Sequence, residues 1–462
     1  MTVYTSATDA DRRAMLDAIG AMSIEELFAD IPGALRLDRP LALPAGMAEQ
    51  EVYEHLKELA ERYVSAEDEI SFLGAGMYDH YVPSLVDTLL SRSEFLTPYT
   101  PYQPEISQGG LQVMFEYQTA ISELTGLPVS NASVYEGPSA VGAAGYLAKL
   151  SNGKPRVLAS RGVHPHSRET LVTLARGYGQ AVEEVPLRDG ATDLDALVAA
   201  LSDDVSAVVL QQPNFLGAVE DVAALTAAAK QVGAIVICAC DPIPLGILEP
   251  PGAQGVDIAV GEGQTLGNRL DYGGPSFGFF AAAQEHIRKM PGRIAGETVD
   301  VDGKRGFVLT LQTREQHIRR EKATSNICTA QALNALAGVV YLGWLGRRGL
   351  VELGELLLQR TAYARETLCA IEGVEPLHEQ PVVRELALRL PGVDVDAVVE
   401  RLAAAGINAG YRLGRSYAEY ADGLLVAITE RRTRAQIDRF AEALGNALAA
   451  ERSSAQAEEV VA

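Results

Sequence analysis

Residues 234–265, AIVICACDPIPLGILEPPGAQGVDIAVGEGQT, decide how this chain folds. The stretch opens with an unbroken apolar run, Ala234–Ala239, which is followed by Asp241 and two prolines. A second apolar run, Ile258–Val260, leads into the polar segment GEGQT. Short apolar runs bounded by Gly and Pro are typical of strands that are buried on both faces of a sheet. The stretch therefore predicts two core strands, each of which ends in a polar loop.

The same pattern continues toward the N-terminus. Further strands are predicted at Val157–Ala159 and Val205–Leu210, and helices at Leu194–Leu201 and Val222–Val232. Asp221 is a good N-cap for the second of these helices, and Gly233 ends it. Strands that alternate with helices indicate an α/β fold, with a mostly parallel sheet covered by helices on both faces. We assign residues 71–315 to this large domain.

The flanking regions have a different character. Residues 1–70 have a helical pattern broken by prolines, which predicts an N-terminal helical arm rather than a core. Residues 316–445 are expected to form a long linking helix, from Thr329 to about Ile371, and a smaller C-terminal α/β domain. Its strands are predicted at Leu386–Leu390 and Leu424–Ile428. The polar tail, residues 446–462, is expected to fray.

Composition excludes several classes of partner. The formal net charge is −22, so nucleic acid and anionic membrane surfaces are poor partners for this chain. The start of the chain has no secretory pattern, and the four cysteines are sparse, which favours a reducing cytoplasm. Cys238 and Cys240 could be half of a metal site, but no second pair or nearby His completes it. We therefore predict no metal, and two buried thiols in the strand.

Ligands bind at the carboxyl ends of strands in open α/β sheets, so the residues just past each strand are site candidates. His164 follows the first strand, Asp241 the third, and Gln264 and Thr265 the fourth. Gly137 and Ser139 lie at a predicted helix start, where free N–H groups could hold a phosphate. Each of these loops alone could be ordinary surface, but together they predict a cofactor cleft.

These features resemble a fold-type-I pyridoxal phosphate (PLP) enzyme. In such enzymes a His stacks on the ring, an Asp keeps the pyridine nitrogen protonated, and a Lys follows the next strand. His164 and Asp241 match the first two. Thr265 stands where the lysine belongs, and no lysine follows an apolar strand at that point; the lysines are Lys57, Lys149, Lys154, Lys230, Lys289, Lys304 and Lys322. The resemblance therefore implies a degenerate cleft without a Schiff base.

Longer stretches narrow the resemblance. FLTPYTPYQPEISQG (95–109), GEGQ (261–264), GGP (273–275) and LQTREQHIRREKATSNICT (311–329) are similar to the P-protein of the glycine cleavage system. The chain resembles the lysine-less N-terminal half of that family. The expected fold is fold-type-I, PLP-dependent transferase-like, with a seven-stranded-type sheet and a smaller C-terminal α/β domain.

The family also implies an activity and partners. It implies the non-lysine subunit of glycine dehydrogenase (aminomethyl-transferring), which decarboxylates glycine and passes the aminomethyl group to the lipoyl group of the H-protein. PLP would be held by a beta subunit whose His-Lys pair falls on Gln264-Thr265 here, in a cytoplasmic α2β2 assembly. Two alternatives remain at this stage: a non-catalytic scaffold of the same complex, and a stand-alone PLP enzyme.

Fold-type-I sites lie at subunit interfaces, so this half is expected to lend residues to its partner. The half-site or interface candidates are Tyr99, Thr100, Tyr102, Gln103, Glu105, Gln108, Gly273 and Gly274. The loop 99–105 could instead only pack an interface, and His164 could simply cap a helix. Four charged residues could dock the H-protein, or form a solvated helix face; these are Arg314, Arg319, Arg320 and Lys322.

Overall fold

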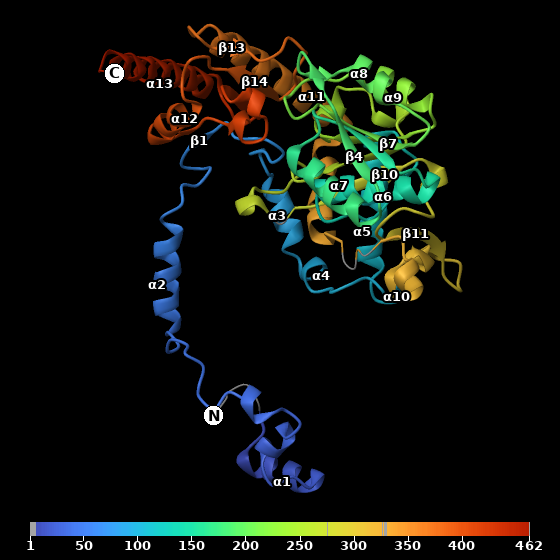
Figure 1. Cartoon of the computed structure of the whole chain (residues 1–462). Coiled ribbons are helices and arrows are strands. Elements are labelled where there is room, and N and C mark those ends of the chain that lie inside the picture. Colours follow the sequence, from blue (N-terminus) through green and yellow to red (C-terminus); the bar gives the residue numbers. More distant parts are fainter. Residues whose placement is uncertain (1–5, 275, 326, 328–329, 462) are drawn as a thin grey trace. The chain divides into compact units, whose positions relative to one another are not determined.

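The computed structural model describes residues 6–274, 276–325, 327 and 330–461, with side chains as far as residue 454. Four residues of the stretches quoted above lie outside the described residues: Pro275, Asn326, Cys328 and Thr329. The chain divides into two compact units, Met1–Val64 and Ser65–Ala462 (Figure 1).

The first unit is built from short helices. Helix α1 (Asp9–Ile19) begins at the N-cap Thr8, whose side chain and that of Asp11 form a capping box, and ends at Gly20 in the left-handed region. Helix α2 (Glu49–Ala60) follows two 3-10 turns. None of the described residues 6–64 is buried, so this segment contains no hydrophobic core of its own.

The second unit is organised around a seven-stranded sheet in the order β2-β10-β9-β8-β7-β3-β4. Strand β10 is antiparallel to both neighbours, and all the other neighbouring pairs are parallel. The prediction of a mostly parallel, seven-stranded sheet is confirmed. The strands are β2 (Val129–Ser130), β3 (Arg156–Ser160), β4 (Ala181–Val185), β7 (Val205–Gln212), β8 (Ile235–Cys240), β9 (Ile258–Glu262) and β10 (Gly278–Ala282).

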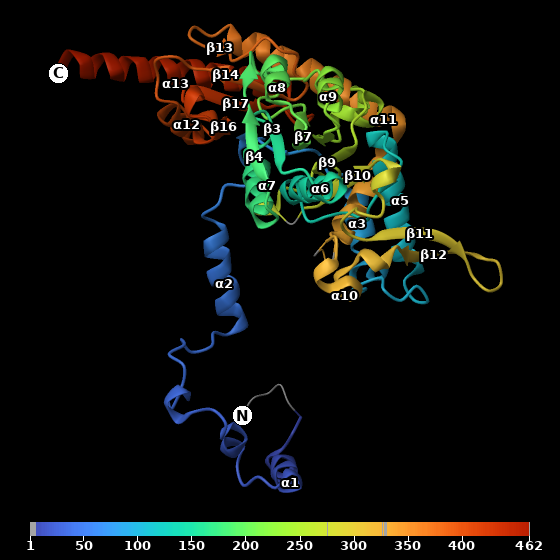
Figure 2. The same cartoon turned by 45° about the vertical axis from the view of Figure 1, so that its right-hand side comes forward.

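Helices cover both faces of this sheet (Figure 2). The alternation of buried residues along β3 agrees with this arrangement. Val157 and Ala159 belong to the core cluster that contains residues of α6 and α7, whereas Leu158 between them belongs to the cluster with residues of α5, α8 and α9 on the opposite face. This period of two puts apolar side chains on both sides of every core strand. The helices are α5 (Gln108–Thr125), α6 (Gly137–Asn152), α7 (Pro165–Gly177), α8 (Leu194–Ala200) and α9 (Val222–Lys230).

Several smaller elements border the sheet. Strands β11 (Ile294–Val299) and β12 (Arg305–Thr310) form a hairpin that packs on α5. The others are α3 (Ser84–Leu90), α4 (Ser93–Leu96), β5 (Leu187–Arg188), β6 (Ala191–Thr192) and α10 (Gln316–Arg319).

The linking helix α11 (Ala332–Cys369), interrupted at the non-helical Gly346, leads into a four-stranded antiparallel sheet with its own core. Strand β1 (Ile70–Ser71), which follows the first unit in the sequence, pairs with β15 (Ile407–Asn408) of this C-terminal region. Helix α13 (Arg434–Val461) continues where fraying was expected, since the tail is rich in Ala and Glu and contains no Gly or Pro. The other elements are β13 (Glu375–Pro376), β14 (Glu385–Arg389), α12 (Val395–Ala404), β16 (Tyr411–Arg412) and β17 (Gly423–Ala427).

Within the described part of the chain, no helix is both long enough and apolar enough to cross a membrane.

Candidate functional site

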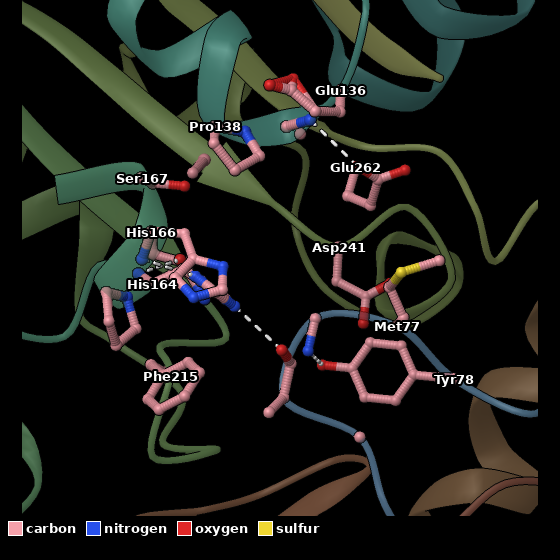
Figure 3. A pocket seen from close by; sticks show the side chains of 18 of the residues that line it. Met77, Tyr78, Glu136, Pro138, His164, His166, Ser167, Phe215, Asp241 and Glu262 are labelled. Atoms are coloured by element: carbon pink, nitrogen blue, oxygen red, sulfur yellow. Dashed lines mark hydrogen bonds between the residues drawn. The ribbon is translucent and has the colours of Figure 1, made fainter. Parts of the chain in front are cut away.

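A cavity of about 520 Å³ opens at the carboxyl edge of the large sheet. Its walls come from the segment 73–78, the starts of α6 and α7, and the residues that follow β7, β8 and β9. Figure 3 shows His164 and Phe215 on one side of it, and Asp241 and Tyr78 on the other. Its position at the ends of parallel strands is the one expected for a ligand site in an α/β sheet.

The structure brings together most of the residues predicted for the cleft. Gly137, His164, Asp241 and Thr265 all line the cavity. Gly273, which was predicted as an interface residue, lines it too.

Two further predicted residues do not line it. Ser139 lies at the third position of α6, where its hydroxyl and N–H bond Glu136. The buried Gln264 side chain accepts the N–H of Tyr78 at 2.9 Å and donates to its carbonyl at 3.1 Å. Both residues therefore hold residues that line the cavity, Tyr78 and Glu136, but do not line it themselves.

Thr265 occupies the position after β9 where a fold-type-I lysine is expected. The residue is only 3% exposed, and its Oγ1 has no hydrogen-bond partner among the described residues. Neither lysine nor arginine occurs among the described residues that line the cavity. The cavity thus offers no amine that could tether an aldehyde cofactor.

The start of α6, where a phosphate was predicted, faces two carboxylates of the chain itself. Glu262 accepts the N–H of Gly137 at 3.0 Å and that of Gln264 at 3.0 Å, and the Ser276 hydroxyl also donates to it. Glu136, the N-cap, accepts the N–H of Ser139. Burial raises the pKa of Glu262, although the three donated hydrogen bonds oppose the shift. Negative groups therefore already occupy the positive end of this helix.

Asp241 also has a partner within the chain. Its Oδ2 forms an ion pair with the Arg384 guanidinium, and its Oδ1 accepts the N–H of Ile243 at 3.2 Å. Arg384 lies 3.2 Å from the centroid of the Tyr78 ring and donates to His80 at 2.6 Å. The carboxylate that was predicted to keep a pyridine nitrogen protonated is paired here with a buried arginine.

His164 combines two roles in the structure. It is the N-cap of α7: its Nδ1 accepts the N–H of His166 at 3.1 Å, and its Nε2 bonds the carbonyl of Ala75 at 2.9 Å. Its ring also lines the cavity, with an edge-to-face contact to Phe215. Burial lowers the pKa of His164 to about 4, so the ring is neutral near pH 7. Helix capping is shown; stacking on a ligand remains a prediction.

These contacts decide how well PLP fits this chain. The phosphate would meet Glu136 and Glu262, the pyridine nitrogen would compete with Arg384 for Asp241, and the aldehyde would meet a hydroxyl. Like charges within a few ångströms of each other oppose binding. The residues present do not fit the cofactor, and no chemical step on PLP is assigned to this cleft.

The loop 99–105 lies apart from the cavity lining and is anchored at two points. The Tyr102 hydroxyl bonds Arg293, whose guanidinium lies 4.4 Å from the centroid of the Tyr102 ring. Gln108 donates to the carbonyl of Pro104 at 2.7 Å and bonds the backbone of Phe307. Tyr99 is 90% exposed. The remaining predicted loop residues are partly or fully exposed: Thr100, Gln103 and Glu105.

The other interface candidates divide into two groups. Gly273 and Gly274 have positive φ, and a Cβ at either would meet no atom of the described residues within 4 Å. Arg314 is not available for docking, because it is buried and donates to the carbonyls of Met290 and Gly292. The sequence reading placed it in an exposed helix, whereas it fixes a turn. Arg319, Arg320 and Lys322 are exposed.

Sequence reasoning overlooked four residues that shape the cavity. Glu136 and Glu262 stand beside motifs that were recognised, so an acid next to an expected phosphate site was an available signal. Tyr78 and Arg384 had no such signal, because their partners are distant in the chain.

Cys238 and Cys240 are buried in β8. Burial raises the pKa of Cys238 to about 12 and also raises that of Cys240. Among the described residues, no group of three or more His, Cys, Asp or Glu converges in a way that could hold a metal ion.

The sheet order, the antiparallel β10 and the cavity at the carboxyl edge define the class: the fold is that of fold-type-I PLP-dependent enzymes. A cysteine desulfurase from Escherichia coli shares this fold, with a TM-score of 0.63 at 16% identity over 84% of this chain and 96% of that one.

The chain belongs to the glycine cleavage system P-protein family, whose model matches residues 2–444. It is 50% identical to the "Probable glycine dehydrogenase (decarboxylating) subunit 1" of Moorella thermoacetica, over 96% of this chain and 100% of the relative. It is also similar to a crystal structure of glycine decarboxylase (P-protein) in inhibitor-bound form. The TM-score is 0.88 at 43% identity, over 96% of this chain and 100% of that one.

Proposed function

We propose that this chain is the lysine-less subunit of a two-subunit glycine decarboxylase. The name of the Moorella thermoacetica relative, a subunit 1, supports a partner subunit. The observation that carries the proposal is Thr265 at the end of β9, in a cavity whose described lining contains no lysine. PLP bound in the partner would supply the electron-withdrawing ring that glycine decarboxylation requires. The aminomethyl group would then pass to the lipoyl group of the H-protein.

The contribution of this chain is to complete the partner's active site across an interface. The loop 99–105 suits this role, because Pro98, Pro101 and Pro104 restrict its backbone and both Tyr102 and Gln108 anchor it to the hairpin β11–β12 region. Exposed Tyr99, Gln103 and Glu105 are left to reach a neighbouring chain. The loop at Gly273 and Gly274 would approach the partner's phosphate.

The assembly we propose is α2β2 and cytoplasmic, with the lipoylated H-protein as a transient partner. The first unit supports a stable partner chain, because apolar side chains such as Leu27, Phe28 and Leu56 are exposed on it. The exposed cations Arg319, Arg320 and Lys322 are the candidate contact for the H-protein. The three described cysteines are free thiols, as is typical of a reducing compartment.

Reconstitution tests this function. The chain is expressed with and without a lysine-bearing P-protein homologue from the same source, and glycine–CO2 exchange is measured for each chain and for the mixture. We expect no exchange by this chain alone, and exchange that rises with added partner to a plateau at 1:1. If the partner alone gives as much exchange as the mixture, the proposal is rejected and a scaffold role is favoured.

The structure gives less support to the two alternatives, a stand-alone PLP enzyme and a passive scaffold. A stand-alone PLP enzyme needs a lysine and a free anion site, and this cavity presents Thr265 and Glu262 instead. A passive scaffold leaves unexplained why a proline-rich loop holds Tyr, Gln and Glu side chains outward.

A further inference from the structure

The cavity has the size and wall chemistry of a small-molecule site, although PLP does not fit it. At about 520 Å³ it lies within the common range for ligand sites, roughly 300–1,000 Å³. Apolar side chains, including Leu73, Met77, Val141 and Phe215, form much of its wall, and a few polar groups converge among them. A cavity of this kind binds a compact organic body and orients it through those polar groups.

Carboxylates are the most numerous ionisable groups on the wall. Glu136, Glu262 and Asp241 are the acidic residues on the wall, which also carries two imidazoles, His164 and His166. Burial lowers the pKa of His164 to about 4. The guanidinium that contacts the lining residue Asp241, that of Arg384, is already paired with this carboxylate. Since the described lining includes neither Lys nor Arg, an anionic ligand would find acceptors where it needs donors.

One buried polar group on the wall has no partner. The hydroxyl of Thr265, a residue 3% exposed, makes no hydrogen bond with any described residue. Leaving a buried hydroxyl unbonded costs about 1–3 kcal/mol. A ligand with a hydrogen-bonding group would satisfy it, and this is an observation independent of the acidic wall.

We propose that this cavity binds a small organic ammonium compound, with an apolar or aromatic body and no phosphate or carboxylate. The ammonium group would bind the remaining lone pairs of Glu262 beside the start of α6, and the body would lie between Phe215 and Met77. Within the described residues no set of metal ligands converges, so an organic cation is favoured over a metal ion. The residues that form the site on this chain are named above, and the proposal does not depend on the catalytic role proposed above.

Three related probes separate the contributions of charge. Pyridoxamine carries an ammonium group, pyridoxine replaces it with a hydroxyl, and pyridoxamine 5′-phosphate adds the phosphate. Isothermal titration calorimetry on the purified full chain measures the dissociation constant of each. We expect pyridoxamine to bind at least about tenfold more tightly than either of the others, which is about 1.4 kcal/mol.

Variants locate the site. Glu262→Gln keeps the size of the side chain. It should weaken the ammonium contact of both probes, and it should reduce the preference for pyridoxamine over its phosphate to within about threefold, since only the phosphate form gains from removal of the negative charge. Glu249→Gln, an exposed acid outside the cavity, is the control and should leave all three constants unchanged. Thr265→Val removes the unbonded hydroxyl without breaking a bond inside the protein, so it tests the site even if Glu262→Gln fails to fold.

The outcomes are decisive in both directions. Tighter binding of pyridoxamine that weakens in Glu262→Gln or Thr265→Val supports the proposal. Equal or tighter binding of the phosphate form to the wild type overturns it, as does the absence of heat with all three probes at millimolar concentration. Binding that none of the cavity variants alters also overturns it, because the probe then binds elsewhere.

Discussion

Asp241, at the end of β8, forms an ion pair with Arg384, which lies just before β14 in the smaller sheet region. The two residues are 143 positions apart in the sequence, and the arginine side chain is 3% exposed. The pair joins the edge of the large sheet to the smaller one, and the Tyr78 ring covers the guanidinium.

The first prediction concerns the stability that this pair supports. Arg384→Ala leaves a carboxylate without its charge partner in a partly buried place, so we expect the free energy of unfolding to fall by about 3–5 kcal/mol. Arg389→Ala, on the strand β14 that follows Arg384, breaks a pair with Asp422 whose arginine is 45% exposed, and should cost about 1 kcal/mol or less. Urea unfolding followed by circular dichroism measures both. Equal losses in the free energy of unfolding would show that the buried pair stabilises the fold no more than the exposed pair does.

The second prediction concerns the missing lysine. Thr265→Lys restores the amine, yet the Glu262 carboxylate still occupies the start of α6. We therefore expect that Thr265→Lys, mixed with PLP and reduced with borohydride, gains no stoichiometric pyridoxyl label at position 265. The wild type should also stay unlabelled. If the single substitution gives full labelling, the acidic wall does not exclude the cofactor, and the loss of PLP binding rests on the lysine alone.

Much of this sheet was predictable because its central strands are buried on both faces. The predicted runs are mostly apolar. The structure extends those of β7 and β9 by two residues each at the carboxyl end and shifts that of β8 by one residue, to Ile235–Cys240. Strand β4, AVEEV, was overlooked because it is an edge strand with mostly exposed residues, so it lacks the apolar pattern. Strand β2 has only two residues, which is too short to show any period.

The site was predictable to the extent that local sequence determines it. The position of Thr265 follows from counting one strand past Asp241, and the helix start at Gly137 follows from small residues and a proline. The partners of these groups were not predictable, since Arg384 reaches Asp241 only through the packing of the two sheets. No spacing rule connects residues separated by more than a hundred positions.

The third prediction concerns pH. Burial lowers the pKa of His164 from 6.5 to about 4, so the unfolded chain binds this proton more strongly than the folded one. The stability from a neutral His164 is therefore complete above pH 6.5 and is lost as the pH falls toward 4. The shift corresponds to roughly 3 kcal/mol at most.

His164→Gln tests this directly. Its free energy of unfolding, measured by urea titration from pH 7.5 to 4.5, should fall less steeply than that of the wild type. His166→Gln, whose side chain is exposed, should keep the wild-type slope. A His164→Gln variant with an unchanged slope would show that His164 is not the group responsible.

The last prediction concerns the loop 99–105, and it separates a contributing half-site from a passive interface. Tyr102 is held by Arg293, which lies 3.4 Å from Glu315, so the loop is fixed by a buried charge cluster. Gln103, the next residue, is exposed. Replacing its side chain therefore does not remove the Tyr102–Arg293 bond that holds the loop. A group positioned on a rigid loop aids catalysis, because small misplacements of reacting atoms greatly reduce the rate.

We expect Gln103→Ala and Tyr102→Phe each to assemble with the lysine-bearing partner at 1:1 and to leave its PLP content unchanged. Turnover of glycine should fall about tenfold or more, which is about 1.4 kcal/mol of transition-state stabilisation. Gln284→Ala, an exposed amide on another loop, is the matched control and should turn over like the wild type. Tyr102→Phe also loses the bond to Arg293, so the Gln103 variant decides between the two roles. If Gln103→Ala assembles and shows wild-type turnover, Gln103 only packs an interface and the catalytic contribution must come from another part of the chain.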